Sequence, residues 1–213
     1  IAMKQFLLGD DTGLGKTIQS VAALCYLWEK DSDLKAIILT NKSAVGQWSR
    51  EFDKFTVGVK TILCKGTPKK RAKAYDEFLA SEGPTVLIMG YRSAVRDIST
   101  IHDLSDYVLI ADEATAFKNS KTQVHQTIAH MSKKASRVWA LTATLIKNNL
   151  MEGWAIYKIL VPDLFPSKTQ FMNHYCIVRM QSIKGGRRQI PIIVGYRKKD
   201  IETFREKIDP FFL

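Results

Sequence analysis

Residues 10–17 read D-D-T-G-L-G-K-T, and they stand between an apolar run at 6–8 and a helical pattern that starts at Ile18. An apolar strand, a glycine-bearing turn and a helix in this order are typical of a phosphate-binding loop. Gly13 and Gly15 let the backbone turn its N–H groups toward a polyphosphate, and the N-terminus of the following helix adds a positive end. The residues predicted to hold the nucleotide are Asp11, Thr12, Gly13, Leu14, Gly15, Lys16 and Thr17.

Two side chains of this loop have a direct chemical part. Lys16 can reach the β- and γ-phosphates, and the hydroxyl of Thr17 can hold Mg²⁺, so the expected cofactors are ATP and Mg²⁺. The strict pattern G-x-x-x-x-G-K-[ST] fails at its first place, where Asp10 stands instead of glycine. This departure points to a helicase-type loop, because such loops tolerate other residues at that place.

A second apolar run, at 107–111, ends in two carboxylates, Asp112 and Glu113. In a parallel sheet the end of such a strand lies beside the phosphate loop. There Asp112 can orient Mg²⁺ and its water, while Glu113 polarises the attacking water. A core strand with a solvated acidic end is the alternative, and the phosphate loop upstream argues against it. The predicted catalytic residues are therefore Lys16, Asp112 and Glu113, and the predicted Mg²⁺ ligands are Thr17 and Asp112.

Short apolar runs alternate with amphipathic stretches as far as about residue 145, as expected for repeated β-α units. Strands are expected at 5–8, 36–40, 60–64, 85–89, 107–111 and 137–141. One apolar helical stripe runs from Ile18 to Trp28, and another runs from Ala44 to Phe55. This pattern predicts an α/β fold in which helices cover both faces of a parallel sheet, with ligands at the carboxyl ends of the strands.

Beyond residue 145 the pattern changes to a helix that stops at Pro162. Segments 176–183 and 189–194 then predict a β-hairpin, because a Gly-Gly pair in a basic stretch between them can supply the turn. No flexible linker marks an internal boundary. We therefore expect one domain over residues 1–213, in which 163–200 form a helical and hairpin extension.

Basic residues outnumber acidic ones by 32 to 21, which gives a formal net charge of +11. This balance favours a polyanionic partner such as nucleic acid, although charge alone leaves that identification open. No run of about 18 apolar residues is present, so no membrane partner is expected. We expect a soluble intracellular protein, in the cytoplasm or nucleoid of a bacterium or phage-infected cell, or in a nucleus. Cys25, Cys64 and Cys176 fit reduced core thiols better than a disulfide or a zinc site.

Several segments resemble the first RecA-like lobe of Swi/Snf-type ATPases, the DNA-translocating branch of helicase superfamily II. The stretch D-D-T-G-L-G-K-T-I-Q looks like the family's D-E-x-G-L-G-K-T-I-Q. Residues 41–55, N-K-S-A-V-G-Q-W-S-R-E-F-D-K-F, are similar to its P-x-S-L-L-x-N-W-x-x-E-F-x-K-F. Residues 111–119, A-D-E-A-T-A-F-K-N, resemble D-E-A-H-R-x-K-N, and residues 141–150, L-T-A-T-L-I-K-N-N-L, resemble L-T-G-T-P-I-Q-N-N-L. The matches follow the family's order almost from end to end.

The resemblance implies a P-loop ATPase lobe that hydrolyses ATP to move along double-stranded DNA once a second RecA-like lobe of the same protein joins it. The residues that the resemblance places between the nucleotide and DNA sites, as coupling residues, are Thr115, Thr142 and Thr144. The residues that it places on DNA are Lys42, Ser43, Tyr91, Lys118, Asn119, Asn148 and Asn149.

Three departures from the family pattern stand out. Thr115 replaces the usual histidine or glutamine, Leu145 replaces a proline, and Arg92 replaces the acidic residue after Tyr91. In the family the residue at the place of Thr115 helps to couple the ATP site to the third motif. Coupling here is therefore expected to use the threonine hydroxyl or to differ in strength. None of the three touches the Mg²⁺ or phosphate chemistry.

Parts of the family's motor lie outside residues 1–213, namely the adenine-reading glutamine segment and the second-lobe motifs with their arginines. We therefore expect half of a motor, from a truncated gene or an excised piece, that alone shows no DNA-stimulated ATPase. Two other classes share these features. A strand-separating helicase or nuclease-coupled restriction motor carries the same motifs, and a non-enzymatic nucleotide or DNA-binding module fits the missing lobe.

Several residues have a plainer interpretation beside the functional one. Ser43 can be an ordinary helix N-cap, and Thr142 can be a residue that only packs at a strand end. Trp48 and Trp154 lie on apolar stripes, so we expect both in the core and not stacked on bases. The basic turn at 184–188 can touch DNA or be merely solvated. The histidines lack metal-ligand spacing and receive no chemical role; they are His102, His125, His130 and His174.

Overall fold

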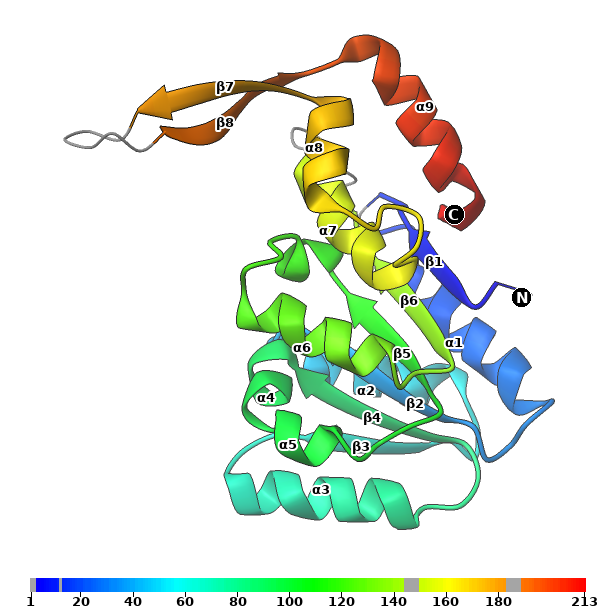
Figure 1. The fold of residues 1–213 in the computed structure, drawn as a ribbon. Coiled ribbons are helices and arrows are strands. Elements are labelled where there is room, and N and C mark those ends of the chain that lie inside the picture. Colours follow the sequence, from blue (N-terminus) through cyan, green and yellow to red (C-terminus); the bar gives the residue numbers. More distant parts are fainter. Residues whose placement is uncertain (1–2, 12, 144–149, 183–188) are drawn as a thin grey trace.

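The computed structural model describes residues 3–11, 13–143, 150–182 and 189–213. Six strands form one parallel sheet with the order β1-β6-β5-β2-β4-β3 (Figure 1). The strands are β1 Gln5–Leu8, β2 Lys35–Thr40, β3 Lys60–Cys64, β4 Thr85–Gly90, β5 Tyr107–Asp112 and β6 Arg137–Leu141. Each strand expected from the apolar runs is present, and the predicted parallel α/β sheet is confirmed.

Neighbouring residues of a central strand enter two separate cores, because side chains alternate between the faces of a sheet. In β2, Ile37 and Leu39 belong to one hydrophobic cluster, whereas Ala36 and Ile38 belong to the other. All four side chains are fully buried. A parallel sheet with such strands requires helices on both faces.

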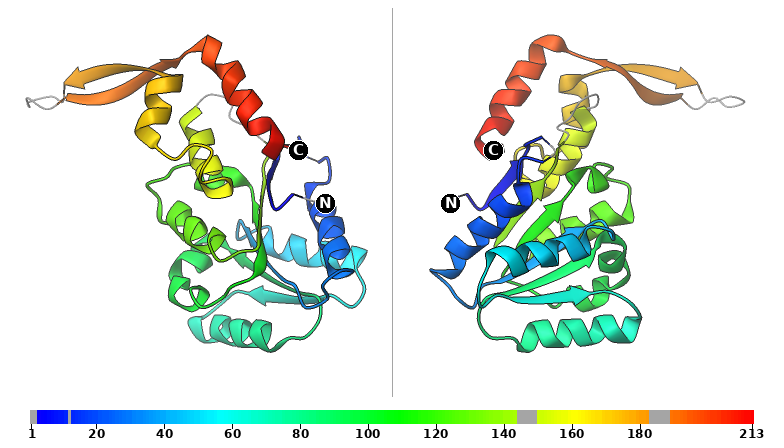
Figure 2. Two further views of the ribbon diagram at one scale, coloured as in Figure 1. Left: turned by 45° about the vertical axis from the view of Figure 1, so that its right-hand side comes forward. Right: turned by 180° about the vertical axis from the view of Figure 1, so that it is seen from behind.

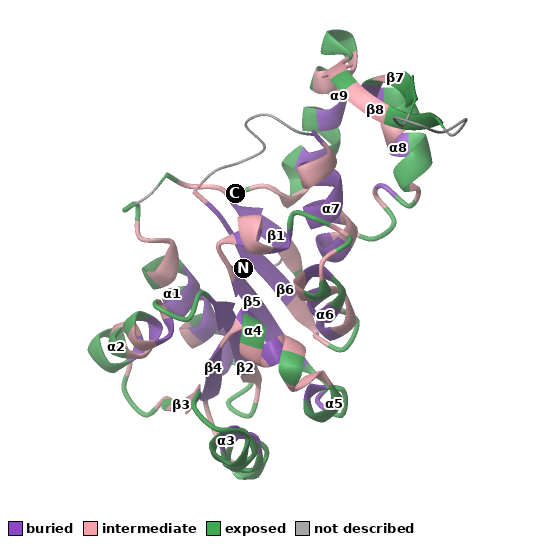
Figure 3. Ribbon diagram, turned by 90° about the vertical axis from the view of Figure 1, so that its left-hand side faces the viewer, coloured by how far each residue is buried: buried purple, intermediate pink, exposed green. Residues whose placement is uncertain are grey.

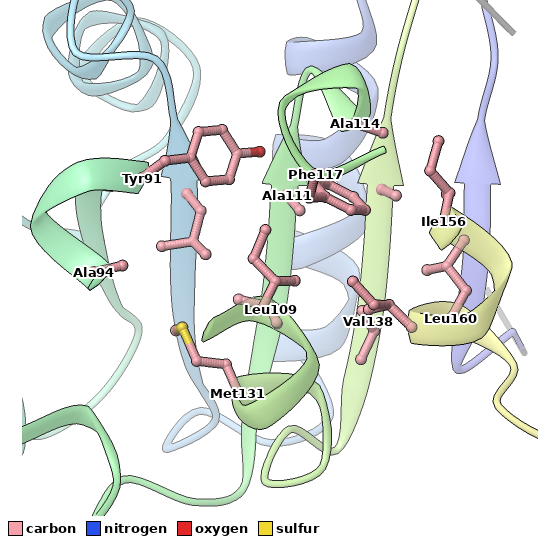
Figure 4. Close-up of a cluster of buried hydrophobic side chains, with 14 of the residues drawn as sticks. Tyr91, Ala94, Leu109, Ala111, Ala114, Phe117, Met131, Val138, Ile156 and Leu160 are labelled. Carbon is pink, nitrogen blue, oxygen red and sulfur yellow. The ribbon is translucent and has the colours of Figure 1, made fainter. Parts of the chain in front are cut away.

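Two sets of helices meet this requirement (Figure 3). On one face lie α1 (Lys16–Trp28) and α2 (Val45–Phe55). The other face is covered by α3 (Pro68–Ala80), α4 (Tyr91–Arg96), α5 (Ile98–Ile101) and α6 (Gln123–Ser132). Figure 4 shows this second core, where Leu109 of β5 points toward Met131 of α6 and Phe117 lies above Ala111. Phe117 belongs to a short 3-10 turn, η1 (Ala114–Phe117).

The last third of the described chain begins on the sheet and continues as an extension. α7 (Leu150–Leu160) packs on the sheet, where Ile156 and Leu160 join the second core (Figure 4). The elements that follow are α8 (Lys168–Tyr175), β7 (Cys176–Ser182), β8 (Gln189–Tyr196) and α9 (Lys198–Ile208). As predicted, a helix ends before Pro162 and an antiparallel hairpin follows. The hairpin projects away from the sheet (Figure 2). The basic turn predicted at 184–188 lies outside the described residues. In the described ranges we find no helix with the length and apolar character needed to cross a membrane.

Aromatic rings join the helices of this extension. Phe171 and Tyr175 of α8 lie with ring centroids 4.7 Å apart, and Phe165 stacks on Phe204 of α9 at 5.5 Å. All four side chains are buried. Aromatic pairs at such distances add about 0.5–1.5 kcal/mol beyond the area that they bury, so this cluster fastens α9 to α8.

The C-terminal residues return to the edge of the sheet. After α9 and a 3-10 turn, η2 (Asp209–Phe211), the N–H of Leu213 donates to the Leu7 carbonyl at 2.9 Å. The N–H of Gly9 in turn donates to the Leu213 carbonyl at 2.8 Å. The end of the described chain therefore lies beside β1, next to the start of the phosphate loop (Figure 1).

All three cysteines are free thiols. Cys64 and Cys176 are buried, as expected of core thiols, whereas Cys25 is half-buried. Burial raises the pKa of Cys64 to about 11, so this side chain stays a neutral thiol at physiological pH.

A buried ion pair ties α3 to the segment between α4 and α5. Arg71 donates through Nε to Asp97 Oδ2 at 2.7 Å and through Nη2 to Oδ1 at 2.8 Å. Its Nη1 donates to the carbonyl of Gly66 at 2.8 Å. The two charged side chains are only 6% and 12% exposed. The pair thus holds the loop after β3 against the end of α4.

Arg71→Met should destabilise the fold strongly. It leaves the Asp97 carboxylate buried without a cation, and removing one partner of a buried pair typically costs about 3–5 kcal/mol. Urea unfolding would measure the loss. The control is Lys60→Met, which breaks the Lys60–Glu77 pair at 44% and 46% side-chain exposure and should cost about 1 kcal/mol or less. Equal losses in the two variants would contradict this assignment.

Candidate active site and nucleic-acid interface

The phosphate loop leaves β1 at the carboxyl edge of the sheet and enters α1. Gly13 and Gly15 have φ angles of 85° and 78°, in the left-handed region where a side chain would strain the backbone. Gly15 is also the N-cap of α1, and among the described residues no side chain caps this helix end. The first N–H groups of a helix are a ready site for an anion, so the loop has the geometry that a polyphosphate requires.

Lys16 lies over the loop itself. Its Nζ donates to the carbonyls of Asp10 and Asp11 at 2.7 and 2.9 Å. Gln19 of α1 donates to the Asp10 carboxylate at 2.9 Å and to the Leu14 carbonyl at 3.0 Å. The strict pattern has glycine at the position of Asp10. Here the Asp10 side chain has a structural role, because it ties the start of the loop to the first turn of α1.

Asp112 ends β5, and hydrogen bonds from two other elements hold its carboxylate. Thr40 Oγ1 of β2 donates to Asp112 Oδ2 at 2.7 Å. Trp48 Nε1 of α2 donates to the same oxygen at 2.8 Å. Two donors hold this oxygen in place and leave Oδ1 of Asp112 without a hydrogen bond from either of them. The sequence placed Trp48 in the core, which its 1% exposure confirms, but it did not reveal this hydrogen bond.

Glu113 has a strained backbone. Its φ of 59° lies in the left-handed region, which costs a residue other than glycine about 1–3 kcal/mol and is found mostly at functional sites. Its Oε1 accepts a hydrogen bond from Thr115 Oγ1 at 3.0 Å. The threonine that departs from the family pattern thus contacts the carboxylate predicted to polarise water.

Sheet register brings the phosphate loop and Asp112 to the same level. Leu141 of β6 pairs with Leu8 on one side and with Asp112 on the other. The two strand ends are therefore two strand spacings apart, roughly 10 Å. Thr142 follows Leu141, is buried, and donates its N–H to the Leu8 carbonyl at 3.0 Å. This predicted coupling residue lies between the two halves of the site.

A basic groove lies at the same edge of the sheet, where β2, β3 and β4 end. Its volume is about 560 Å³, and its lining includes four basic side chains and no acidic one. The four are Lys42, Lys65, Arg92 and Arg96. Sequence reasoning selected Lys42 but missed the other three. Their position shortly after predicted strands was the available signal, because the ends of parallel strands meet at one edge.

Tyr91 lines this groove but turns its hydroxyl toward the nucleotide site. The hydroxyl donates to the backbone carbonyl of Asp112. Burial, aided by the nearby Asp112 and Glu113 carboxylates, raises the pKa of Tyr91 well above its usual value. The phenol therefore remains a hydrogen-bond donor at physiological pH.

Other residues predicted to bind nucleic acid lie elsewhere. Lys118 forms an ion pair with Glu152 at 3.1 Å, and Asn119 Oδ1 accepts from the Lys121 N–H at 3.0 Å. Neither lines the groove. Ser43 is exposed and is not an N-cap, because Ala44 holds that place in α2. Outside the described residues are Thr12, Thr144, Asn148 and Asn149.

A family profile described as the SNF2-related domain matches residues 2–201. The chain belongs to this family. The predicted resemblance to Swi/Snf-type ATPases is thereby confirmed. In this SNF2-related domain, the glycine loop, the acidic strand end and the groove occupy one edge of the family's parallel sheet.

Over the aligned segments, curated relatives are identical to this SNF2-related domain at about a third of the positions. Nuclear protein STH1/NPS1 of Saccharomyces cerevisiae is 33% identical over 172 residues, which are 79% of this chain and 12% of that protein. Chromodomain-helicase-DNA-binding protein 1-like of Mus musculus is 32% identical over 160 residues, covering 75% of this chain and 18% of that protein. The chain thus spans less than a fifth of the length of these relatives.

Solved structures agree on the fold. The Sulfolobus solfataricus SWI2/SNF2 ATPase core in complex with dsDNA aligns with a TM-score of 0.79 at 23% identity, over 98% of this chain and 39% of that one. The core domain of the same ATPase, described without DNA, aligns with a TM-score of 0.71 at 23% identity, covering 98% of this chain and 38% of that chain. This likeness confirms the RecA-like sheet.

Lys16→Ala should weaken Mg-ATP binding without unfolding the domain. The substitution removes the positive charge that the loop can bring to the β- and γ-phosphates, whereas it costs the fold two hydrogen bonds from Lys16 Nζ to loop carbonyls. Calorimetric titration with Mg-ATP would measure the affinity, and circular dichroism would confirm the fold. Lys30→Ala, a change in the turn after α1, is the control. Unchanged binding in Lys16→Ala would rule out the assignment.

Proposed function

We propose that this SNF2-related domain binds Mg-ATP in the phosphate loop and double-stranded DNA in the basic groove. Joined to a second RecA-like lobe of the same protein, it hydrolyses ATP to move along duplex DNA. The observation that carries this proposal is the meeting of three features at one sheet edge: the glycine loop, the Asp112–Glu113 pair and a groove with four cations.

The names of similar proteins support this function. One relative, 31% identical over 166 residues, is the ISWI chromatin-remodeling complex ATPase ISW2 of Saccharomyces cerevisiae. The Sulfolobus solfataricus ATPase core was solved in complex with dsDNA. Another relative is named a nuclear protein, which supports an intracellular location. We infer the same classes of ligand for this chain, namely ATP and duplex DNA.

The side chains suit this chemistry. The hydroxyl of Thr17 and the carboxylate of Asp112 are hard oxygen donors, the kind that Mg²⁺ prefers beside nucleotide phosphates. When bound, Mg²⁺ neutralises charge that develops on the transferred phosphoryl group. The ammonium group of Lys16 brings a positive charge next to the negative β- and γ-phosphates. Glu113, oriented by Thr115, polarises the attacking water.

Two alternatives use the same residues differently. A non-hydrolysing nucleotide or DNA-binding module would need the loop and the groove but no carboxylate to polarise water. The strained and hydrogen-bonded Glu113 favours hydrolysis. A strand-separating helicase or restriction motor would have the same site, and a strand-displacement assay on the two-lobe protein distinguishes it from a translocase. The lobe alone is expected to lack DNA-stimulated hydrolysis, because the family resemblance implies that an arginine of the second lobe stabilises the charge on the transferred phosphoryl group.

Glu113→Gln should separate binding from hydrolysis. The amide keeps the shape of the side chain but cannot polarise water as a base, and this contribution is typically worth about 10²–10⁴ in rate. In a two-lobe protein carrying this domain, we expect near-normal ATP affinity and hydrolysis slower by at least about 10². Phosphate release measures the rate, with Glu77→Gln on the distant α3 as the control. Near-normal turnover would assign the role to another residue.

DNA binding should be independent of sequence and should weaken steeply with salt, because cations in the groove contact phosphates. Each phosphate contact contributes about −0.9 to the slope of log K against log salt concentration. Arg96→Gln should therefore make the slope shallower by about 0.9. Fluorescence anisotropy with two unrelated duplexes would measure it. Lys30→Gln is the control, since Lys30 precedes β2 and lies at the opposite edge of the sheet. A preferred sequence, or a salt-independent affinity, would contradict the proposal.

A further inference from the structure

Asp112 is hydrogen-bonded to the wall of the basic groove. Thr40, whose Oγ1 donates to Asp112 Oδ2 at 2.7 Å, lines the groove. Tyr91, whose hydroxyl donates to the Asp112 carbonyl, lines it as well. The predicted metal-holding residue of the nucleotide site is thus hydrogen-bonded to two residues that also line the predicted DNA site.

Trp48 adds a third connection, through a helix. It lies in the first turn of α2, which begins at Val45 on the groove wall, three residues after Lys42. Its indole Nε1 donates to Asp112 Oδ2 at 2.8 Å. A movement of the N-terminal end of α2 therefore moves a hydrogen-bond donor of Asp112.

The surroundings of Trp48 make this connection stiff. The side chain is 1% exposed and packs on Phe52 of the same helix, with ring centroids 6.4 Å apart. Phe52 packs in turn on Trp28 of α1, also at 6.4 Å. Close-packed interiors leave little room for a side chain to shift alone. The indole therefore follows the helix and does not absorb its displacement.

We propose that Trp48 is a positioning residue that couples the two sites: a DNA phosphate seated at Lys42 and the start of α2 sets, through the indole N–H, the orientation of Asp112 and with it the affinity for Mg-nucleotide. This inference rests on the proposed function and adds a route separate from Thr142 and Thr144. Coupling of two binding sites is reciprocal, so Mg-nucleotide must change DNA affinity by the same factor.

The first test asks whether DNA binding changes the environment of the Trp48 indole in the 213-residue chain without nucleotide. In a protein labelled with ¹⁵N at its four tryptophans, the missing indole signal in Trp48→Phe identifies Trp48. Adding a mixed-sequence DNA duplex should shift this signal. The indole signal of Trp154 should stay in place, because its Nε1 donates to the distant Phe165 carbonyl at 3.1 Å. Asp112→Asn should shift the Trp48 signal in the absence of any ligand.

The second test measures the coupling. The dissociation constant of a fluorescent, non-hydrolysable ATP analogue with Mg²⁺ is determined with and without saturating duplex, in a two-lobe protein carrying this domain. We expect DNA to change it by about fivefold or more in the parent protein. Trp48→Phe should reduce this factor to about twofold or less, whereas Trp154→Phe, which also removes a buried indole donor, should leave it unchanged. Thermal unfolding of both variants shows whether stability differs.

The outcomes separate this inference from the proposed function. If duplex binds but the Trp48 signal does not move, or if the coupling factor is the same in Trp48→Phe, the inference is wrong while the proposed function stands. If neither the chain nor the two-lobe protein binds duplex, the proposed function is wrong and the inference falls with it. A shifted signal together with a lost coupling factor supports both.

Discussion

Parallel pairing of the central strands determines where each candidate site residue of this domain lies. Leu141 of β6 pairs with Leu8 and with Asp112, and β2 continues the sheet on the far side of β5. The central strands are buried on both faces. A shift of one residue would exchange the faces of every side chain, so packing of two cores holds the register. The positions of the candidate nucleotide-site residues and of the groove therefore depend on the register of these strands.

Polar residues near the strand ends link the groove wall to the end of β5 by hydrogen bonds. Thr40 and Trp48 are buried, and a buried polar group needs a partner. Both donate to the same oxygen of Asp112. The same requirement that stabilises this part of the core therefore also orients the carboxylate that we propose to hold Mg²⁺. The backbone strain at Glu113 is tolerated next to this well-packed network.

Local sequence patterns predicted much of this architecture. Apolar runs with turn residues between them located all six strands, since a strand buried on both faces needs a continuous apolar stretch. The glycine loop and the acidic strand end were recognisable because their chemistry depends on residues adjacent in sequence. The expectation that Trp48 lies in the core was right, but it was incomplete, because a hydrophobic stripe does not tell which buried indole finds an acceptor.

The sequence by itself determined the order of elements, the phosphate loop and the two carboxylates, since each is encoded within a short segment. Only the tertiary structure decided that Lys65 and Arg96 share a groove with Lys42, and that Trp48 reaches Asp112 across 64 residues of chain. These contacts follow from the strand order β5-β2-β4-β3. That order depends on long-range pairing of strands that are similar in composition, and no local period or spacing specifies which of them become neighbours.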